Sequence, residues 1–272
     1  MVDLHIHTTA SDGWFTPSEV ISQAKEKRLT TIAITDHNTI DGIIQLENIK
    51  NYGINIIPGI EMYTDENDLH ILGYNIDIDD EKLKKKLRYL AVSYISSITS
   101  LCKIIYKKYN IYIPICFEGK IVKKKFIASK LIETKIVSSY NMAYELLDYT
   151  YQGIDPPKQL NYREVIQTIH DARGIAVLAH PGRLLKKYSW SDVKYKLEDM
   201  IRNGLEGVEC FNPIHSKAEE QLFLDYSLEN QLYITGGSDY HGKLNEQIGE
   251  ITKESDIDEI QKYLFYPTRI KE

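Results

Sequence analysis

The chain has 272 residues, 43% of them hydrophobic, which is enough to bury a sizeable core as one α/β barrel or as two ordinary domains. Its three cysteines, Cys102, Cys116 and Cys210, are widely spaced and form no CxxC pair, which excludes a disulfide framework and a thiolate zinc site. No apolar stretch comes near the roughly 18 residues of a membrane span, and no basic leader precedes Val2. We therefore expect a cytoplasmic protein without membrane contact.

The net charge of −6 is unevenly distributed. Residues 81–135 hold 14 Lys and Arg against 3 Asp and Glu, a balance of +11, and the remainder holds 19 against 36, or −17. A basic segment of this kind suits a phosphorylated or polynucleotide substrate. The alternative interpretation is a solvated helix face in a lysine-rich composition.

Short apolar runs bounded by Gly, Pro and polar residues predict seven strands. They cover residues 2–7, 31–37, 54–61, 69–72, 175–180, 207–210 and 233–241. Thr16 with Glu19 forms a capping-box pattern that starts a helix running to about Leu29, and a second helical stretch is predicted over 39–51. This strand and helix order indicates a parallel sheet.

The rhythm of strands and helices stops near Ile76 and resumes after Pro156. Between them Leu83, Leu87, Leu90 and Tyr94 follow helical spacing, and no predicted strand ends on a candidate ligand. We therefore predict an α/β barrel in two parts, residues 1–78 and 156–272, interrupted by a helical, basic insertion over residues 79–155.

Six of the seven predicted strands end on a residue type that binds metals or transfers protons, and the run 69–72 carries His70 near its start. A parallel barrel places its active site at the C-terminal ends of its strands. His5 and His7 are two residues apart and so point to the same side of a strand. Asp239 and His241 repeat that spacing on the last strand, and the first and last strands become neighbours when a barrel closes.

Glu61 ends an apolar strand, where burial of a carboxylate costs several kcal/mol unless a cation or donors meet it. Asp12, in a Ser-Asp-Gly turn, is alternatively a turn former, and each histidine is alternatively a satisfied core residue. The full set of candidate metal ligands is His5, His7, Asp12, His37, Glu61, His70, His180, Asp239 and His241. Such nitrogen and oxygen donors suit two or three divalent ions, with Mn²⁺ preferred and Zn²⁺ or Fe²⁺ as alternatives.

These residues stand in segments that resemble the PHP (polymerase and histidinol phosphatase) family of metal-dependent phosphoesterases. The segments are Asp3-Leu4-His5-Ile6-His7, Ser11-Asp12-Gly13, Ile34-Thr35-Asp36-His37, Pro58-Gly59-Ile60-Glu61, Leu69 to Tyr74, Ala179 to Arg183 and Gly237 to His241. The resemblance covers nearly the whole chain and implies a distorted (β/α)7 TIM-like barrel with a trinuclear metal centre.

The resemblance also implies how the ligands divide. The first metal would take His5, His7, Glu61 and Asp239, the second Glu61, His70 and His180, and the third Asp12, His37 and His241. The most similar branch includes a 3′,5′-nucleotide bisphosphate phosphatase and a 5′-to-3′ exoribonuclease. That branch carries a Gly-Arg-Pro-His-Ile-Ala-type segment where this chain has Lys123 to Ala128 without the histidine, so the substrate is left open.

Two further residues are candidates for catalysis. Arg183 follows His180 by three residues and could hold a phosphate with both guanidinium nitrogens, with a surface arginine as the alternative. His215 lies just after the strand that ends at Cys210 and could give a proton to the leaving oxygen or contact phosphate, with a loop histidine as the alternative. We interpret His170 as structural and Cys210 as a packing residue.

Together these features predict an enzyme that hydrolyses a phosphate monoester or terminal phosphodiester by metal-activated water, with a nucleotide or short oligoribonucleotide as substrate. A histidinol-phosphate-type phosphatase and a non-catalytic metal-binding or nucleic-acid-binding module are the alternatives. An amidohydrolase is a further alternative, disfavoured because no apolar run ends on a lysine. The oligomeric state is left open.

Overall fold

The computed structural model describes residues 1–46, 49–117, 120–253 and 262–264. The chain forms two compact units. The first, which we call the barrel unit, consists of Met1–Lys85 and Leu160–Glu272. The second, the insert unit, is Lys86–Gln159, against the limits of 79 and 155 that the sequence predicted.

The barrel unit contains one seven-stranded sheet, and the predicted number of strands is confirmed. In sheet order the strands are β1 (Val2–Ile6), β2 (Thr31–Ile34), β3 (Asn55–Tyr63), β4 (His70–Tyr74), β7 (Ile175–Leu178), β8 (Gly207–Phe211) and β9 (Tyr233–Gly236). A bridge between Ile6 and Tyr240 joins the chain after β9 back to β1, and the His7 amide donates to the Tyr240 carbonyl at 2.9 Å. The sheet therefore closes nearly into a barrel.

The expectation of a wholly parallel sheet is wrong at β4, which pairs antiparallel with both β3 and β7. Residues 64–69 form the connection between β3 and β4, and this is too short for the helix that a parallel crossover needs. As a result β4 begins at the end of the barrel where β3 finishes, and Tyr63 pairs with His70.

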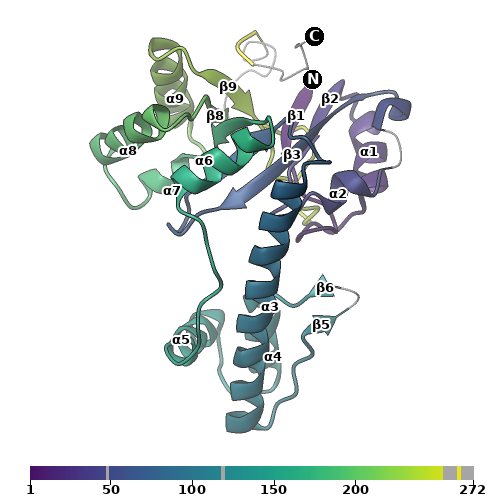
Figure 1. Ribbon diagram of the computed structural model, residues 1–272, viewed down its shortest axis with the longest axis vertical. Helices are drawn as coiled ribbons and strands as arrows, with labels where there is room; N and C mark the ends of the chain where they lie inside the picture. Colours follow the sequence, from purple (N-terminus) through teal and green to yellow (C-terminus); the bar gives the residue numbers. More distant parts are fainter. Residues whose placement is uncertain (47–48, 118–119, 254–261, 265–272) are drawn as a thin grey trace. The chain divides into compact units, whose positions relative to one another are not determined.

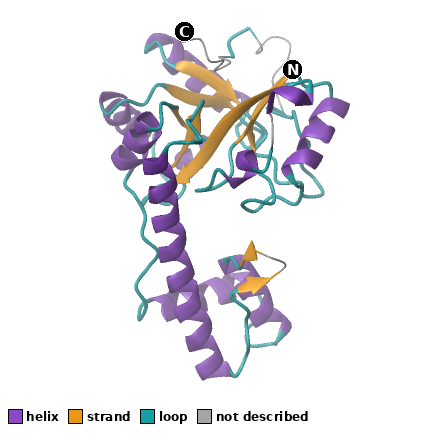
Figure 2. Cartoon of the chain, turned by 45° about the vertical axis from the view of Figure 1, so that its right-hand side comes forward, coloured by secondary structure: helices purple, strands orange, loops and turns teal. Residues whose placement is uncertain are grey.

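Helices surround the strands of the barrel unit (Figures 1 and 2). Helix α1 (Pro17–Glu26) has Thr16 as its N-cap, and the predicted capping box with Glu19 is confirmed. The single helix predicted over 39–51 is wrong, because the chain forms only α2 (Asp41–Ile44) and the 3₁₀ turn η1 (Ile49–Tyr52), with residues 47 and 48 outside the described part. The later helices are α6 (Tyr162–Asp171), α7 (Gly182–Leu185), α8 (Trp190–Arg202) and α9 (Lys217–Glu229).

Two apolar clusters hold the barrel unit together. One cluster joins five neighbouring strands and consists of Leu4, Ala33, Ile57, Leu72, Tyr74, Val177 and Ala179, all at most 2% exposed. The other packs the β1–β2 side of the sheet against α1 and α2, with Ile32 and Ile34 facing Val20 and Ile43. This buried apolar surface fixes the strands whose ends carry the candidate ligands.

The insert unit has a core of its own. It contains the long helix α3 (Glu81–Tyr109), which begins in the barrel unit, and the helices α4 (Lys124–Glu133) and α5 (Tyr140–Tyr151). Strands β5 (Cys116–Phe117) and β6 (Lys120–Ile121) form a short antiparallel pair. Ile98 and Leu101 of α3 pack with Leu131 of α4 and Leu147 of α5, all fully buried.

Helix α3 corrects the expectation that no stretch approaches a membrane span. It has 29 residues, and one 18-residue window reaches a mean hydropathy of 1.2 with 33% of the window buried. A core helix of a soluble protein passes the same test, so one such helix is weak evidence for a span. Its buried residues Ile98, Leu101 and Ile105 belong to the core of the insert unit.

The closing edge of the barrel is fastened by the carboxylate of Asp3, which is fully buried. It accepts hydrogen bonds from the backbone amides of Ser238 at 2.9 Å and Gly249 at 2.8 Å, and from the Ser238 hydroxyl at 2.5 Å. Burial raises the pKa of Asp3 above its ordinary value although these donors oppose the shift. One side chain of β1 thus holds the segment that follows β9.

Replacing Asp3 with Ala should destabilise the protein, because two buried backbone donors lose their acceptor. We expect the free energy of unfolding to fall by about 1–3 kcal/mol or more, measured by urea denaturation. The matched control is the exposed Asp171→Ala, whose side chain only accepts from Gln167 on the helix surface. Equal stability of Asp3→Ala and the control would contradict the role of Asp3 in closure.

Candidate metal centre

The nine candidate ligands meet at one end of the barrel, although they come from segments up to 236 residues apart, from His5 to His241. They form three groups in which one ligand atom from each residue lies within 4.8 Å of the others. The groups are His5, His7, Glu61 and Asp239; Glu61, His70 and His180; and His7, Asp12, His37 and His241. Glu61 belongs to two groups and so does His7, so the three groups adjoin one another.

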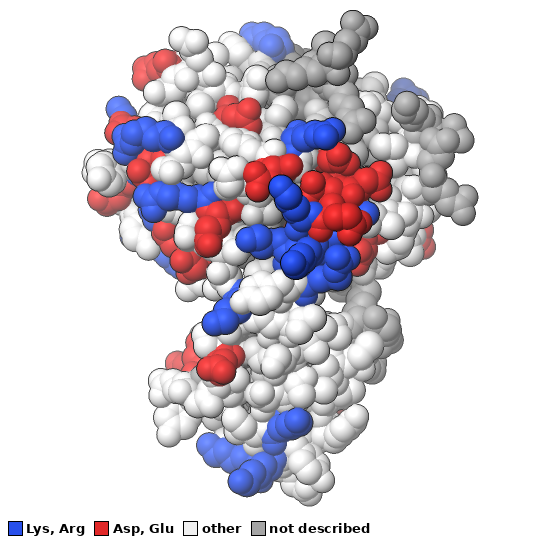
Figure 3. All heavy atoms as spheres, in the orientation of Figure 1, with Lys and Arg blue, Asp and Glu red and all other residues white. Residues whose placement is uncertain are grey.

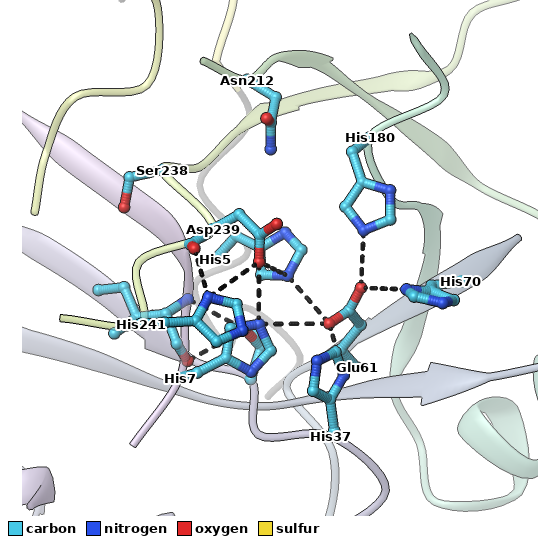
Figure 4. A network of polar contacts seen from close by, with 12 residues as sticks. His5, His7, His37, Glu61, His70, His180, Asn212, Ser238, Asp239 and His241 are labelled. Atoms are coloured by element: carbon cyan, nitrogen blue, oxygen red, sulfur yellow. Dashed lines mark hydrogen bonds and ion pairs between the residues drawn. The ribbon is translucent and has the colours of Figure 1, made fainter. Parts of the chain in front are cut away.

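Glu61, at 0% exposure, is the centre of the arrangement (Figure 4). Its Oε1 lies 2.9 Å from His70 Nδ1 and 2.9 Å from His180 Nε2. Its Oε2 lies 3.2 Å from His5 Nε2, 3.3 Å from His7 Nε2 and 2.8 Å from His37 Nδ1. Each carboxylate oxygen therefore faces its own set of imidazole nitrogens, as a bridging ligand would.

The other two carboxylates complete the outer groups. Asp239 Oδ1 lies 3.5 Å from His5 Nε2 and 3.2 Å from His7 Nε2. Asp12 Oδ1 lies 3.3 Å from His241 Nε2 and 3.7 Å from His37 Nε2. These separations exceed those of most hydrogen bonds and leave room for a common partner between the two atoms.

Several of these buried atoms make no hydrogen bond of acceptable geometry with another described residue, although some lie close together, as do His37 Nδ1 and Glu61 Oε2 at 2.8 Å. The atoms without such a bond are His5 Nε2, both ring nitrogens of His7, His37 Nδ1, Glu61 Oε2 and His180 Nδ1. Buried polar atoms are almost always paired, so a concentration of orphaned donors and acceptors at one place calls for a ligand. Imidazole nitrogens and carboxylate oxygens that converge in this way fit divalent metal ions.

The titration behaviour of the groups follows from burial and mutual contact. Burial would raise the pKa of Glu61, but the imidazoles of His37 and His5 hold it well below its ordinary value. Burial lowers the pKa of His37 to about 4, whereas the carboxylates of Asp239 and Glu61 outweigh burial at His7 and raise its pKa to about 10. The carboxylates therefore stay ionised at neutral pH, and positive charge beside them stabilises the folded chain.

Two ligand candidates occupy strained backbone positions directly after their strands. His180 has φ 28° and Asp239 has φ 52°, in the left-handed region that non-glycine residues rarely adopt. Such a conformation costs of order 1–3 kcal/mol and persists only where the surroundings hold it. The strained positions therefore lie in the segments after β7 and β9 that carry candidate ligands.

Three buried carboxylates that the sequence did not single out as site residues lie behind the ligands. They are Asp3, Asp36 and Glu209, each at most 1% exposed. Each accepts hydrogen bonds from segments that carry ligands: from Ser238, from Thr8 and Ser11, and from His5 and His180 respectively. The available signal was a carboxylate inside or at the end of a predicted apolar strand, but the sequence could not show what each one contacts.

Arg183 and His215 are placed differently from the nine ligands. Arg183 Nη2 lies 2.7 Å from Asp239 Oδ2, and a third of its side chain is exposed at the edge of the centre. His215 is buried, and both ring nitrogens face backbone groups: Nε2 accepts from the Gly182 amide at 3.1 Å, and Nδ1 donates to the Cys210 carbonyl at 3.0 Å. A Cβ at Gly182 would lie 2.4 Å from the His215 ring, so this glycine permits the contact.

The two residues interpreted as structural lie outside the three groups. His170 pairs with Glu206 at 3.2 Å on the outside of the barrel. Burial raises the pKa of the Cys210 thiol to about 12, which leaves it protonated and unreactive.

The model of the PHP domain family matches residues 3–204. The phosphoribosyl 1,2-cyclic phosphate 1,2-diphosphodiesterase of Eggerthella lenta is 28% identical over 255 residues, 89% of this chain and 94% of that protein. The 5′-3′ exoribonuclease Rnm of Escherichia coli is 31% identical over 252 residues, 88% of this chain and 84% of that protein.

A solved structure shares the fold. It is that of an amidohydrolase from Chromobacterium violaceum with bound sulfate and no metal, with a TM-score of 0.73 and 22% identity over 98% of both chains. At this identity the likeness shows the fold alone, and it brings no amidohydrolase activity to this chain.

Addition of Mn²⁺ to protein treated with a chelator should raise the midpoint of thermal unfolding, because the ion binds atoms that are converged only in the folded state. Binding at a hundred times the dissociation constant stabilises by about 2.7 kcal/mol, or about 5–10 °C for a chain of this size. Differential scanning fluorimetry with Mn²⁺, Zn²⁺ and Mg²⁺ in separate samples measures the shift. An unchanged midpoint with every ion would show that the cluster does not bind metal.

Proposed function

The chain belongs to the PHP domain family of metal-dependent phosphoesterases, and from this premise we propose that it hydrolyses a phosphate monoester or terminal phosphodiester of a nucleotide or short oligoribonucleotide. The single observation that carries the proposal is the convergence of six imidazoles and three carboxylates in three adjoining groups. A chain that had lost activity would be expected to lack some of these ligands, so the non-catalytic alternative is disfavoured.

The three groups support a site for three divalent ions, with Mn²⁺ as our first choice. Glu61, shared by two groups, would bridge two of the ions, and Asp239 would join it at the ion held by His5. His7 stands in the first group and also in the group of Asp12, His37 and His241, so it could serve as a ligand in either. Nine ligands shared among three ions would supply fewer than six protein ligands to each, which would leave room for substrate oxygens.

Divalent ions in such a site act as Lewis acids on phosphoryl oxygens and lower the pKa of water. The side chains of the protein determine where the ions and the substrate phosphate would bind. Glu61 and Asp239, both ionised, fix where positive charge collects, and the buried imidazoles around them exclude bulk water. The substrate phosphate would then meet its ligands already arranged, which is the condition for electrostatic stabilisation of the transition state.

Arg183 is our candidate for holding the substrate phosphate. Its guanidinium lies beside Asp239 at the edge of the centre and stays partly exposed, so it can exchange a carboxylate contact for a phosphate contact. For His215 the geometry favours a positioning role in place of the proton transfer expected from sequence, because both ring nitrogens are already hydrogen-bonded to the backbone. Its contact with Gly182 holds the turn that carries His180 and Arg183.

The preference for nucleotides and short RNA rests on the relatives and on charge. The exoribonuclease named above is 31% identical to this chain. The insert unit, residues 86–159, has 12 Lys and Arg against 5 Asp and Glu, a balance of +7. On the face drawn in Figure 3, basic side chains gather at one end of this unit. An excess of positive charge favours a substrate with several phosphates.

Replacing Glu61 with Gln or His180 with Ala should lower kcat at least about a thousandfold, because each change removes a ligand or the bridging charge. Steady-state hydrolysis assays with Mn²⁺ measure the loss, and circular dichroism checks that the variants are folded. His170→Ala is the matched control, a histidine outside the three groups that should keep wild-type turnover. Near-normal kcat in either ligand variant would contradict the proposal.

The substrate class is tested with a panel assayed by phosphate release and by chromatography of the products. The panel holds 3′,5′-bisphosphorylated adenosine, 5′-phosphorylated oligoribonucleotides, phosphoribosyl 1,2-cyclic phosphate and histidinol phosphate. We expect kcat/KM to be highest for one of the first two, because both carry several phosphates next to a base. Activity confined to histidinol phosphate or to the cyclic sugar phosphate would leave the phosphoesterase intact and refute the nucleotide preference.

A further inference from the structure

Glu209, on β8, contacts three segments of the centre without belonging to any ligand group. Its side chain is fully buried. Oε1 lies 3.0 Å from His5 Nδ1, and Oε2 accepts from the His180 amide at 2.7 Å and from Asn212 Nδ2 at 3.2 Å. Figure 4 shows Asn212 above the cluster, on the side of His5 and His180. One carboxylate therefore links β1, the end of β7 and the turn after β8.

The contact with His5 selects which imidazole nitrogen faces the centre. A carboxylate only accepts hydrogen bonds, so Nδ1 of His5 is the protonated ring nitrogen and donates a hydrogen bond to Glu209. The lone pair then lies on Nε2, which is 3.2 Å from Glu61 Oε2 and 3.5 Å from Asp239 Oδ1. A carboxylate behind a histidine in this way fixes its tautomer and orientation and strengthens it as a ligand.

The surroundings allow little freedom to this pair. A Cβ at Gly237 would lie 2.2 Å from the His5 Cβ and 2.9 Å from Glu209 Oε1, so the loop after β9 closes over the contact. The bond to the His180 amide also holds the residue whose φ of 28° is strained. The position of Glu209 is thus determined from three sides.

Asp36, just before His37, has the corresponding place behind the third group. Its Oδ1 accepts from the Thr8 amide at 2.8 Å and from the Ser11 hydroxyl at 2.6 Å, and its Oδ2 accepts from the Thr8 hydroxyl at 2.7 Å. These donors belong to the turn that presents Asp12. A Cβ at Gly42 would lie 2.1 Å from Asp36 Oδ2, so only glycine at that position leaves room for the carboxylate.

We propose that Glu209 and Asp36 are positioning residues that act on different metals: Glu209 through His5 on the first, and Asp36 through the turn of Asp12 on the third. The inference rests on the proposed function, since it takes the three groups to be metal sites. It goes beyond that function because it assigns separate metals to two residues that bind none. The binding of each metal can then be weakened without changing any of its ligands.

Glu209→Gln and Asp36→Asn keep the size of each side chain and remove its charge. We expect each variant to bind one of the three Mn²⁺ ions about 10- to 100-fold more weakly than the wild type does, measured by titration against a chelator indicator and by metal content after gel filtration. The assignment of each metal comes from combining the variants with ligand changes. Glu209→Gln keeps an oxygen that can still accept from the His180 amide, so its effect should run through His5. It should have no further effect on metal content when His5→Ala is already present, and should keep its full effect beside His241→Ala. Asp36→Asn should show the opposite dependence.

Glu220→Gln is the matched control, because Glu220 is a carboxylate at 1% exposure on α9 and outside the three groups. It should bind metal as the wild type does. If Glu209→Gln does not fold, Glu209→Asp replaces it, and Thr8→Val replaces Asp36→Asn by removing one donor from the same turn. Both replacement variants should weaken the binding of the same metals, but to a smaller extent.

Three results would overturn the inference. Wild-type metal affinity in folded Glu209→Gln and Asp36→Asn would show that neither residue positions a ligand. Loss of the same metal in both variants, or an equal effect of Glu220→Gln, would show that the roles are not separate. A wild-type protein that binds no metal would overturn the proposed function as well, so the failure of the inference alone is recognised by normal metal binding in the wild type.

Discussion

The structure depends on one electrostatic constraint: the carboxylates of Glu61 and Asp239 and the six imidazoles around them are largely taken out of water at one end of a barrel, while Asp12 stays partly exposed beside them. Glu61 has no exposed surface, and an ionised carboxylate in such a place costs several kcal/mol unless positive charge meets it. The imidazoles around it can supply part of that charge only by taking protons, which makes them poor ligands. Divalent cations resolve this conflict, since they leave the imidazoles neutral and satisfy the carboxylates at once.

The barrel meets this constraint through its topology. Parallel strands present their carboxyl ends together, which brings His5, Glu61 and His180 to the same end. The antiparallel β4 adds His70 at its first residue, because the hairpin after β3 turns back at that same end. His70 and His180, which both contact Glu61, therefore come from strands that run in opposite directions. The short loop 64–69 allows this because it turns the chain back directly after β3.

Much of the centre could be predicted from sequence because the ligands follow strands. The His5 and His7 spacing, Glu61 after an apolar run and His180 before Pro181 are local patterns, and all nine residues lie in the three groups. The direction of β4 was missed because a short apolar run does not encode its partner strand. The contacts of His215 were missed for a different reason: its ring nitrogens face the backbone of Gly182 and Cys210, which only the folded chain brings together.

The outer carboxylates show where sequence patterns stop. Glu209 stands at the end of an apolar run as Glu61 does. Glu61 faces Nε2 of His5 within the ligand groups, whereas Glu209 contacts Nδ1 on the other side of the same ring. The strands that carry His5 and Glu209 are both irregular: the pairing of β1 with β2 shifts between Asp3 and Ile6, and that of β8 with β9 shifts between Glu209 and Phe211. Irregularities of this kind re-aim side chains beside active sites. Because they lie in the strands that carry His5 and Glu209, they act on the two side chains whose contact, at 3.0 Å, orients the His5 ring toward Glu61.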